Sequence, residues 1–256
     1  MTWLDNLILA VIEGITEYLP VSSTGHMMMA GYILKLDASK IDTYLVSVQF
    51  GAILAVVLLY YRRFFNFRDF SFYLKLLAGF MPAAILGFLF DDFLEQLLQT
   101  PIIVGITLLV VGVFLLFMEK WLPAGTKTTD TMSYTDAFKI GLVQSIAMIP
   151  GVSRSASTIA GSLGCKLSKE AATEFSFFLA VPTLSAAGFY KLYKNWDSLS
   201  TSQLQDIAIG NILSFITAIL AVRFFLNLVK NSGFKWFGWY RIAAGSLFLA
   251  YIWYQS

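Results

Sequence analysis

Residues 11–29 read V-I-E-G-I-T-E-Y-L-P-V-S-S-T-G-H-M-M-M, a stretch that is apolar at both ends and polar in the middle. Its polar residues are Glu13, Glu17, Ser22, Ser23, Thr24 and His26, the only histidine of the chain. Pro20 and Gly25 interrupt any helix that runs through it. Ionisable side chains inside apolar segments are costly and usually functional. A second interrupted stretch, P-G-V-S-R-S-A-S-T at 150–158, is its expected partner.

The composition predicts a membrane protein. The chain has 256 residues, of which 57% are hydrophobic and only 13% are charged, and its mean hydropathy is +0.70. A soluble domain carries about 25% charged residues. We therefore expect one integral membrane domain over residues 1–256. The net charge of +2 is spread over the ends of apolar runs, which excludes a nucleic-acid-binding patch.

Six apolar segments have about the length that a transmembrane helix needs, roughly 20 residues. They are Ile41–Tyr61, Phe72–Phe90, Pro101–Met118, Ala171–Tyr190, Ile207–Leu228 and Phe237–Tyr254. Basic residues favour the cytoplasmic side of a membrane. Arg62, Arg63 and Arg68 therefore place the end of the first segment inside, whereas Lys191 and Lys194 fall on the outer side and contradict this scheme.

The two interrupted stretches are too short on either side of their breaks to cross a bilayer. Each is expected to form a re-entrant helical hairpin, over about residues 1–35 and about residues 135–165, because irregular backbone at membrane depth must line a protein cavity. A single spanning helix kinked at Pro20 remains an alternative for the first. Basic residues on both flanks suggest that the second enters from the cytoplasmic side.

The two halves of the chain resemble each other. Placing Glu13 over Gln144 brings residues 20–24 over residues 151–155. An odd number of spans separates the two hairpins, so they must enter from opposite faces. The fold class is therefore predicted to be an all-α polytopic membrane protein, with residues 1–125 and 133–256 as inverted-topology repeats, a plan that many transporters share.

Glu13 and Glu17 are four residues apart and would lie on one face of a helix. Two such carboxylates can hold a hard divalent cation or can share a proton. A pair at the membrane surface is the alternative. His26 could donate or accept a proton, or could be a structural hydrogen-bonded residue. Ser23 is a candidate nucleophile if His26 or a glutamate serves as its base, whereas Ser22 is expected to satisfy freed backbone groups.

The second stretch is suited to an anion. Gly151 allows a tight turn, and a helix restarting near Ser155 would point its free N–H groups at the anion. The Arg154 guanidinium can grip phosphate with two hydrogen bonds, although a snorkelling surface arginine is the alternative. Further hydroxyl donors to the phosphate are expected from Thr24, Ser153, Ser155 and Thr158.

Together the two stretches predict a phosphate-handling site inside the membrane, whose substrate carries a lipid tail. A transporter or flippase for a phosphorylated polyprenyl lipid is the rival function. A transporter has no need of a nucleophile beside its carboxylates, so the cluster of glutamates, serine and histidine favours an enzyme.

At E-G-I-T-E-Y-L-P-V-S-S-T-G-H, residues 13–26, and at residues 150–158 the sequence resembles the bacterial undecaprenyl-pyrophosphate phosphatase family, which is linked to bacitracin resistance. The resemblance implies hydrolysis of undecaprenyl pyrophosphate to undecaprenyl phosphate, at the outer face of the bacterial inner membrane, to recycle the lipid carrier of peptidoglycan synthesis. It also implies a divalent cation, Mg²⁺ or Ca²⁺. The residues to which it assigns catalytic or supporting roles are Glu13, Glu17, Ser23, His26, Arg154, Ser153 and Thr158.

The resemblance continues into W-F-G-W-Y-R-I at 236–242. Whether Arg241 in this segment lines the site or anchors the chain at the cytoplasmic surface stays open at this point, as does a homodimer.

Overall fold

The computed structural model describes residues 2–36, 44–98, 100–196 and 200–255. These residues form helices and connecting loops without any extended strand. The helices are α1 Trp3–Thr16, α2 Ser23–Ile33, α4 Gln49–Leu59, α5 Tyr61–Phe64, α6 Phe70–Leu89, α7 Asp91–Leu98, α8 Pro101–Trp121, α9 Tyr134–Gln144, the 3₁₀ helix η1 Ser145–Met148, α10 Arg154–Gly164, α11 Lys169–Asn195, α12 Thr201–Ser232 and α13 Lys235–Gln255.

Four of the described helices, α6, α8, α11 and α12, are long and apolar enough to cross a membrane. They confirm the expectation of a multi-pass, all-α membrane protein. A shorter apolar helix covers Tyr44–Leu59, and the predicted start of that span at Ile41 lies outside the described residues. Helix α13 has the length of a span but is less hydrophobic than these four.

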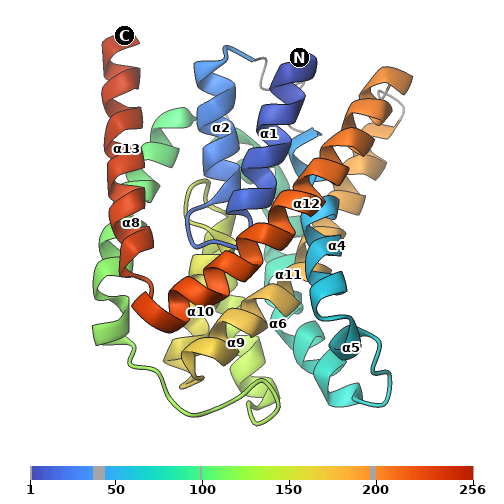
Figure 1. Cartoon of the computed structure of the whole chain (residues 1–256), viewed down its shortest axis with the longest axis vertical. Coiled ribbons are helices and arrows are strands. Elements are labelled where there is room, and N and C mark those ends of the chain that lie inside the picture. Colours follow the sequence, from blue (N-terminus) through green and yellow to red (C-terminus); the bar gives the residue numbers. More distant parts are fainter. Residues whose placement is uncertain (1, 37–43, 99, 197–199, 256) are drawn as a thin grey trace.

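Each interrupted stretch folds as two short helices joined by a break. The first consists of α1 and α2, separated by residues 17–22, and the second consists of α9 and α10, separated by η1 and residues 149–153. Figure 1 shows the α1–α2 pair at the end of the molecule where the chain termini lie, and the α9–α10 pair at the other end. Both hairpins begin with the same signal, a capping box at Thr2 and Asp5 and another at Ser133 and Asp136.

The longer helices surround these two hairpins. Helix α1 packs along α12, α9 packs along α6, and α8 packs along α13. Small residues allow the close approaches, because a side chain at Gly14 would meet the backbone of Ser214 on α12, and one at Gly141 would meet the backbone of Gly79 on α6. The first helix of each hairpin therefore packs closely on a long helix from the other half of the chain.

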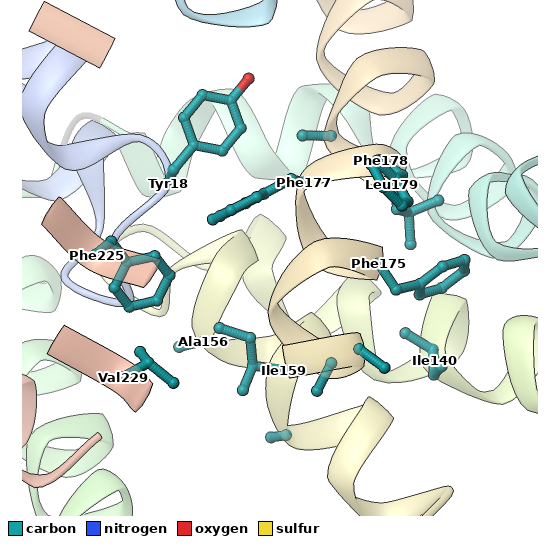
Figure 2. Packing of buried hydrophobic residues seen from close by; sticks show 14 of the residues in the cluster. Tyr18, Ile140, Ala156, Ile159, Phe175, Phe177, Phe178, Leu179, Phe225 and Val229 are labelled. Atoms are coloured by element: carbon teal, nitrogen blue, oxygen red, sulfur yellow. The ribbon is translucent and has the colours of Figure 1, made fainter. Parts of the chain in front are cut away.

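An aromatic core lies beside the breaks. The Phe177 ring of α11 packs edge-on against Tyr18, with ring centroids 5.2 Å apart, and lies 5.9 Å from Phe225 of α12. Figure 2 shows these rings together with Ile159 and Val229 around α10 and α11. Because Tyr18 belongs to the first break, this core fixes the break against the second half of the chain.

Candidate functional site

The two breaks end in the same unusual backbone conformation. Ser22 is the N-cap of α2 with φ 74°, and Ser153 is the N-cap of α10 with φ 83°. Non-glycine residues with positive φ are uncommon and concentrate at functional sites. Each serine side chain accepts a hydrogen bond from the backbone N–H three residues later, so Ser22 satisfies a freed backbone group as expected. The conformation places Ser23 and Arg154 at the first position of their helices.

The breaks touch each other in the middle of the molecule. A β-carbon on Gly25 would lie 3.3 Å from the Cα of Gly151. The Ser155 hydroxyl donates a 2.8 Å hydrogen bond to the backbone carbonyl of Tyr18, which links α10 to the first break. Two segments far apart in the sequence are thereby fixed side by side, as Figure 1 also shows.

Glu17 is the centre of the site because its two carboxylate oxygens bind one residue from each hairpin. The Ser23 hydroxyl donates to Oε2, and Arg154 donates to Oε1 from Nη2 at 3.1 Å and from Nε at 3.3 Å. The Glu17 side chain is 4% exposed and the Arg154 side chain is 9% exposed. A buried ion pair of this kind compensates charges that would be costly alone.

Further contacts orient the Arg154 guanidinium. Its Nη1 donates to the backbone carbonyl of Ser176 on α11 at 2.8 Å, and its Cζ lies 5.7 Å from the Tyr18 ring centroid. The Thr158 hydroxyl donates to Ser176 Oγ at 2.7 Å. Thr158 therefore helps to position Arg154 indirectly, because both residues bind Ser176. Sequence reasoning missed Ser176, which no motif distinguishes from other serines in apolar helices.

Glu13 lies one helical turn before Glu17 and is fully buried. Neither of its carboxylate oxygens makes a hydrogen bond among the described residues, although Glu17, Ser23 and Arg154 lie close enough to interact with it electrostatically. Such an orphaned carboxylate beside a second one fits a divalent cation. The described residues contain no group of three or more His, Cys, Asp or Glu side chains that could hold a metal. A cation bound by Glu13 and Glu17 would therefore take its other oxygens from substrate and water.

His26 lies one turn after Ser23 on α2, and its described hydrogen bonds go to residues other than Glu17 and Arg154. Its Nδ1 lies 2.7 Å from the backbone carbonyl of Ser22, which can only accept, so Nδ1 carries the proton and donates. Its Nε2 then accepts a hydrogen bond from the Tyr240 hydroxyl at 2.8 Å in the neutral imidazole. The two rings also stack, with an interplanar angle of 9°. The structure thus gives His26 contacts with Ser22 and Tyr240, and sequence reasoning missed Tyr240.

A cavity of about 500 Å³ opens next to Glu17. The candidate residues that line it are Glu17, Ser22, Ser23, Thr24, Ser153 and Arg154. Four candidates, Glu13, His26, Ser155 and Thr158, lie outside its lining. Asp91, Tyr190 and Lys191 line its far end, near the ends of α6 and α11, and Lys194 donates a 3.0 Å hydrogen bond to Asp91. The cavity therefore runs from the polar breaks to the molecular end that carries the chain termini.

Arg241, which sequence alone left open, is fully buried in α13. Its Nη1 donates to the carbonyl of Pro20 at 3.0 Å, and its Nη2 donates to the carbonyls of Gly151 and, at 3.4 Å, Thr107. One guanidinium thereby binds the backbone of both breaks. This position excludes the surface anchoring that the nearby Lys235 suggested.

Comparison with known proteins agrees with this geometry. The chain is 48% identical to an undecaprenyl-diphosphatase of Flavobacterium johnsoniae, over 97% of this chain and 96% of the relative. It is 43% identical to one of Bdellovibrio bacteriovorus, over 97% and 95%, and 41% identical to one of Porphyromonas gingivalis, over 97% and 96%. A family model described as bacitracin resistance protein BacA matches residues 6–247. The chain belongs to the BacA family.

Proposed function

We propose that this protein hydrolyses undecaprenyl diphosphate to undecaprenyl phosphate and inorganic phosphate. The observation that carries the proposal is the position of Glu17, which binds a serine hydroxyl with one oxygen and an arginine with the other at the wall of a cavity. Phosphoryl transfer needs a positioned nucleophile and positive charge near the phosphate oxygens, and this arrangement offers both. The names of the relatives support the same activity and do not favour a transporter or flippase.

In the first step, the Ser23 hydroxyl attacks the terminal phosphorus. The new Oγ–P bond forms as the bond from this phosphorus to the bridging oxygen breaks, and undecaprenyl phosphate leaves. The Ser23 proton passes to Glu17, which already accepts a hydrogen bond from this hydroxyl. Arg154 turns its Nε and Nη2 edge to the phosphate oxygens while Nη1 stays on Ser176. In the second step, water attacks the phosphoserine, inorganic phosphate leaves and Ser23 recovers a proton.

The family resemblance implies a divalent cation, Mg²⁺ or Ca²⁺, and we assign Glu13 and Glu17 as its protein ligands. When bound, such an ion supplies positive charge to the phosphate oxygens. The orphaned oxygens of Glu13 are the support for this assignment. Thr24 and Ser153 line the cavity and would donate to the phosphate, whereas Ser155 and Thr158 hold the breaks and Arg154 in place.

His26 has a supporting role in this proposal. Its Nδ1–H binds the carbonyl of Ser22, the strained N-cap residue directly before Ser23. Its predicted function as a proton acceptor for Ser23 is less favoured, because its described hydrogen bonds go to Ser22 and Tyr240, whereas Glu17 accepts from Ser23 directly.

We further infer an arrangement of six transmembrane helices and two re-entrant hairpins as inverted repeats in the bacterial inner membrane. Equivalent positive-φ N-caps at Ser22 and Ser153, together with the hairpins' opposite directions in Figure 1, support the repeats. The connections between α5 and α6, α8 and α9, α10 and α11, and α12 and α13 lie toward the end of the molecule away from the termini in Figure 1. These connections and the helix ends beside them carry Arg62, Arg63, Arg68, Lys120, Lys127, Lys166, Lys169, Lys230 and Lys235. That end is cytoplasmic under the positive-inside rule. The cavity then opens toward the outer face, where the family resemblance expects the active site.

The proposal is tested by measuring phosphate release from undecaprenyl diphosphate by the purified full-length protein in detergent. Glu17→Gln, Ser23→Ala and Arg154→Ala should each lower kcat by at least about 10²-fold, since each removes a group that acts on the reacting phosphate. Exposed Arg223 on α12 provides the control, and Arg223→Ala should leave kcat near the wild-type value. Near-normal release by folded Arg154→Ala protein would refute the assignment.

A further inference from the structure

The site cavity is too small for a whole polyprenyl diphosphate. Its volume of about 500 Å³ is that of a pocket for a drug-sized molecule. The diphosphate group and a few isoprene units would fill it. Between Arg154 and the polar far end at Asp91, an apolar part of its wall comes mainly from α6 and α11 and includes Phe80, Ala84, Leu184 and Ala187. The rest of a long chain must therefore leave the cavity through a neighbouring apolar surface.

A second hollow lies in the seam between the same two helices. It has a volume of about 420 Å³ and, on α6, is lined by Tyr73, Leu76, Leu77 and Phe80. The α11 side contributes Val181, Pro182 and Ser185, and Phe64 of α5 completes the lining. We call this hollow the seam groove. The Tyr73 hydroxyl already donates to the carbonyl of Phe64 at 2.7 Å, so the ring faces an apolar environment without an unpaired donor.

The seam groove and the site cavity meet at Phe80, which lines both. The lining residues of α6 recur every three or four positions from Tyr73 to Phe88, which is one continuous face of a helix. On α11, Leu184 lines the cavity and the next residue, Ser185, lines the groove. The Leu77 side chain is half exposed, so the groove opens sideways on an apolar surface.

We propose that the seam groove is a second substrate subsite, which holds the polyprenyl chain of the diphosphate after it passes Phe80. The inference rests on the proposed function, because it assumes that the diphosphate group lies at Glu17 and Arg154. An apolar chain fits here for two reasons. First, the groove continues the cavity on the same two helix faces. Second, a chain that lies in the groove makes van der Waals contacts with both helices.

The test compares substrates that share the headgroup and differ in chain length. Farnesyl diphosphate is short enough to remain within the cavity, whereas undecaprenyl diphosphate must extend beyond it. Ser185→Phe places a ring in the seam groove. We expect it to lower the ratio of kcat/KM for the long substrate to kcat/KM for the short one by about tenfold, the effect of losing the van der Waals contacts of a few methylene groups with the groove.

Two controls separate filling of the groove from other effects. Ser185→Ala leaves the groove open, and Leu220→Phe puts the same ring on the exposed face of α12; neither should change the ratio.

Leu77→Trp fills the groove from its open side and serves as a second variant if Ser185→Phe does not fold. Both groove-filling variants must lower the ratio, and an unchanged ratio in folded protein would overturn the proposal. Absence of phosphate release from both substrates by the wild type would instead contradict the proposed function.

Discussion

Replacing Arg241 with methionine tests whether one buried guanidinium fixes the position of the two breaks relative to each other. Methionine keeps most of the length and apolar bulk of the arginine stem but has no donor. The change removes the bonds to the carbonyls of Pro20, Gly151 and Thr107. It leaves the proposed catalytic side chains untouched, because none of them contacts Arg241 through these bonds.

The expected effect is larger on turnover than on stability. The bonds to Pro20 and Gly151 link the two breaks, and a hydrogen bond to a charged group contributes about 1.5–3 kcal/mol. The wild-type protein buries a cation whose described partners are all neutral carbonyls, and this burial costs free energy. The variant avoids that desolvation cost, which offsets part of the loss. The net loss should be about 1–3 kcal/mol. Displacing one break by about 1 Å would separate Ser23 from Arg154 and lower kcat by about 10²-fold.

The assay measures kcat and KM for phosphate release together with the thermal unfolding temperature in detergent. Arg223→Met is the matched control, because it makes the same substitution at an exposed arginine of α12. Arg241→Lys is informative as well, since a single ammonium cannot span carbonyls of two segments as a planar guanidinium does. We expect Arg241→Lys to recover less than a tenth of the lost turnover.

The reasoning would be refuted by an Arg241→Met protein that keeps wild-type kcat. Equal losses of kcat in Arg223→Met would also refute it, because they would point to a general effect of removing positive charge. A variant that unfolds at the growth temperature would show that Arg241 stabilises the fold, and the milder Arg241→Lys would then decide on turnover.

Three further changes have defined outcomes. Ser176→Ala removes a hydroxyl beside Arg154, and kcat/KM should fall by about threefold to tenfold, the effect of one hydrogen bond. Gly51→Ala places a methyl group against a backbone carbonyl of α12 and should lower the unfolding temperature measurably, whereas a change to alanine at an exposed position should not. Burial raises the pKa of the Asp91 carboxyl, but the hydrogen bonds from Lys194 and Tyr190 and the nearby lysine charges together outweigh burial and hold the pKa below its ordinary value of about 3.9. This stabilisation is present above the unfolded pKa and is lost as pH falls through the folded pKa, so Asp91→Asn should lower the unfolding temperature at pH 7 and have no effect well below pH 4.

The sequence predicts the breaks well because they depend on local chemistry. Pro20 has no backbone N–H for a helical hydrogen bond, Gly151 adopts a positive φ, and the serines that follow them are strong N-caps. The structure accordingly begins α2 at Ser23 and α10 at Arg154. The sequence also predicts that the two interrupted stretches meet around a phosphate, but it does not predict the direct ion pair between Arg154 and Glu17 that joins them in the structure.

The remaining parts of the site depend on long-range contacts that local patterns do not contain. His26 pairs with Tyr240, which lies 214 positions later, and this contact is the reason why we propose that His26 supports the loop rather than accepts a proton. The sequence leaves Arg241 open between a residue of the site and a surface anchor, and only the packing of α13 against α8 places it in the interior. The predicted divalent cation is not tested by the structure and stays a prediction.

The contacts of Arg154 also suggest how substrate can enter without leaving the buried guanidinium unpaired. Glu17 holds the Nε and Nη2 edge of the guanidinium, and the Ser176 carbonyl holds Nη1 from the opposite helix. A phosphate oxygen can therefore replace Glu17 at Nε and Nη2 while Nη1 stays on the Ser176 carbonyl. Because one anion replaces another, the buried positive charge of Arg154 keeps a negative partner throughout. Ser23 binds the other oxygen of the same carboxylate and need not move during this exchange. Under the proposed mechanism, Glu17 therefore occupies the position of the phosphate beside Arg154 until the diphosphate arrives, and Ser23 keeps its hydrogen bond to Glu17 meanwhile.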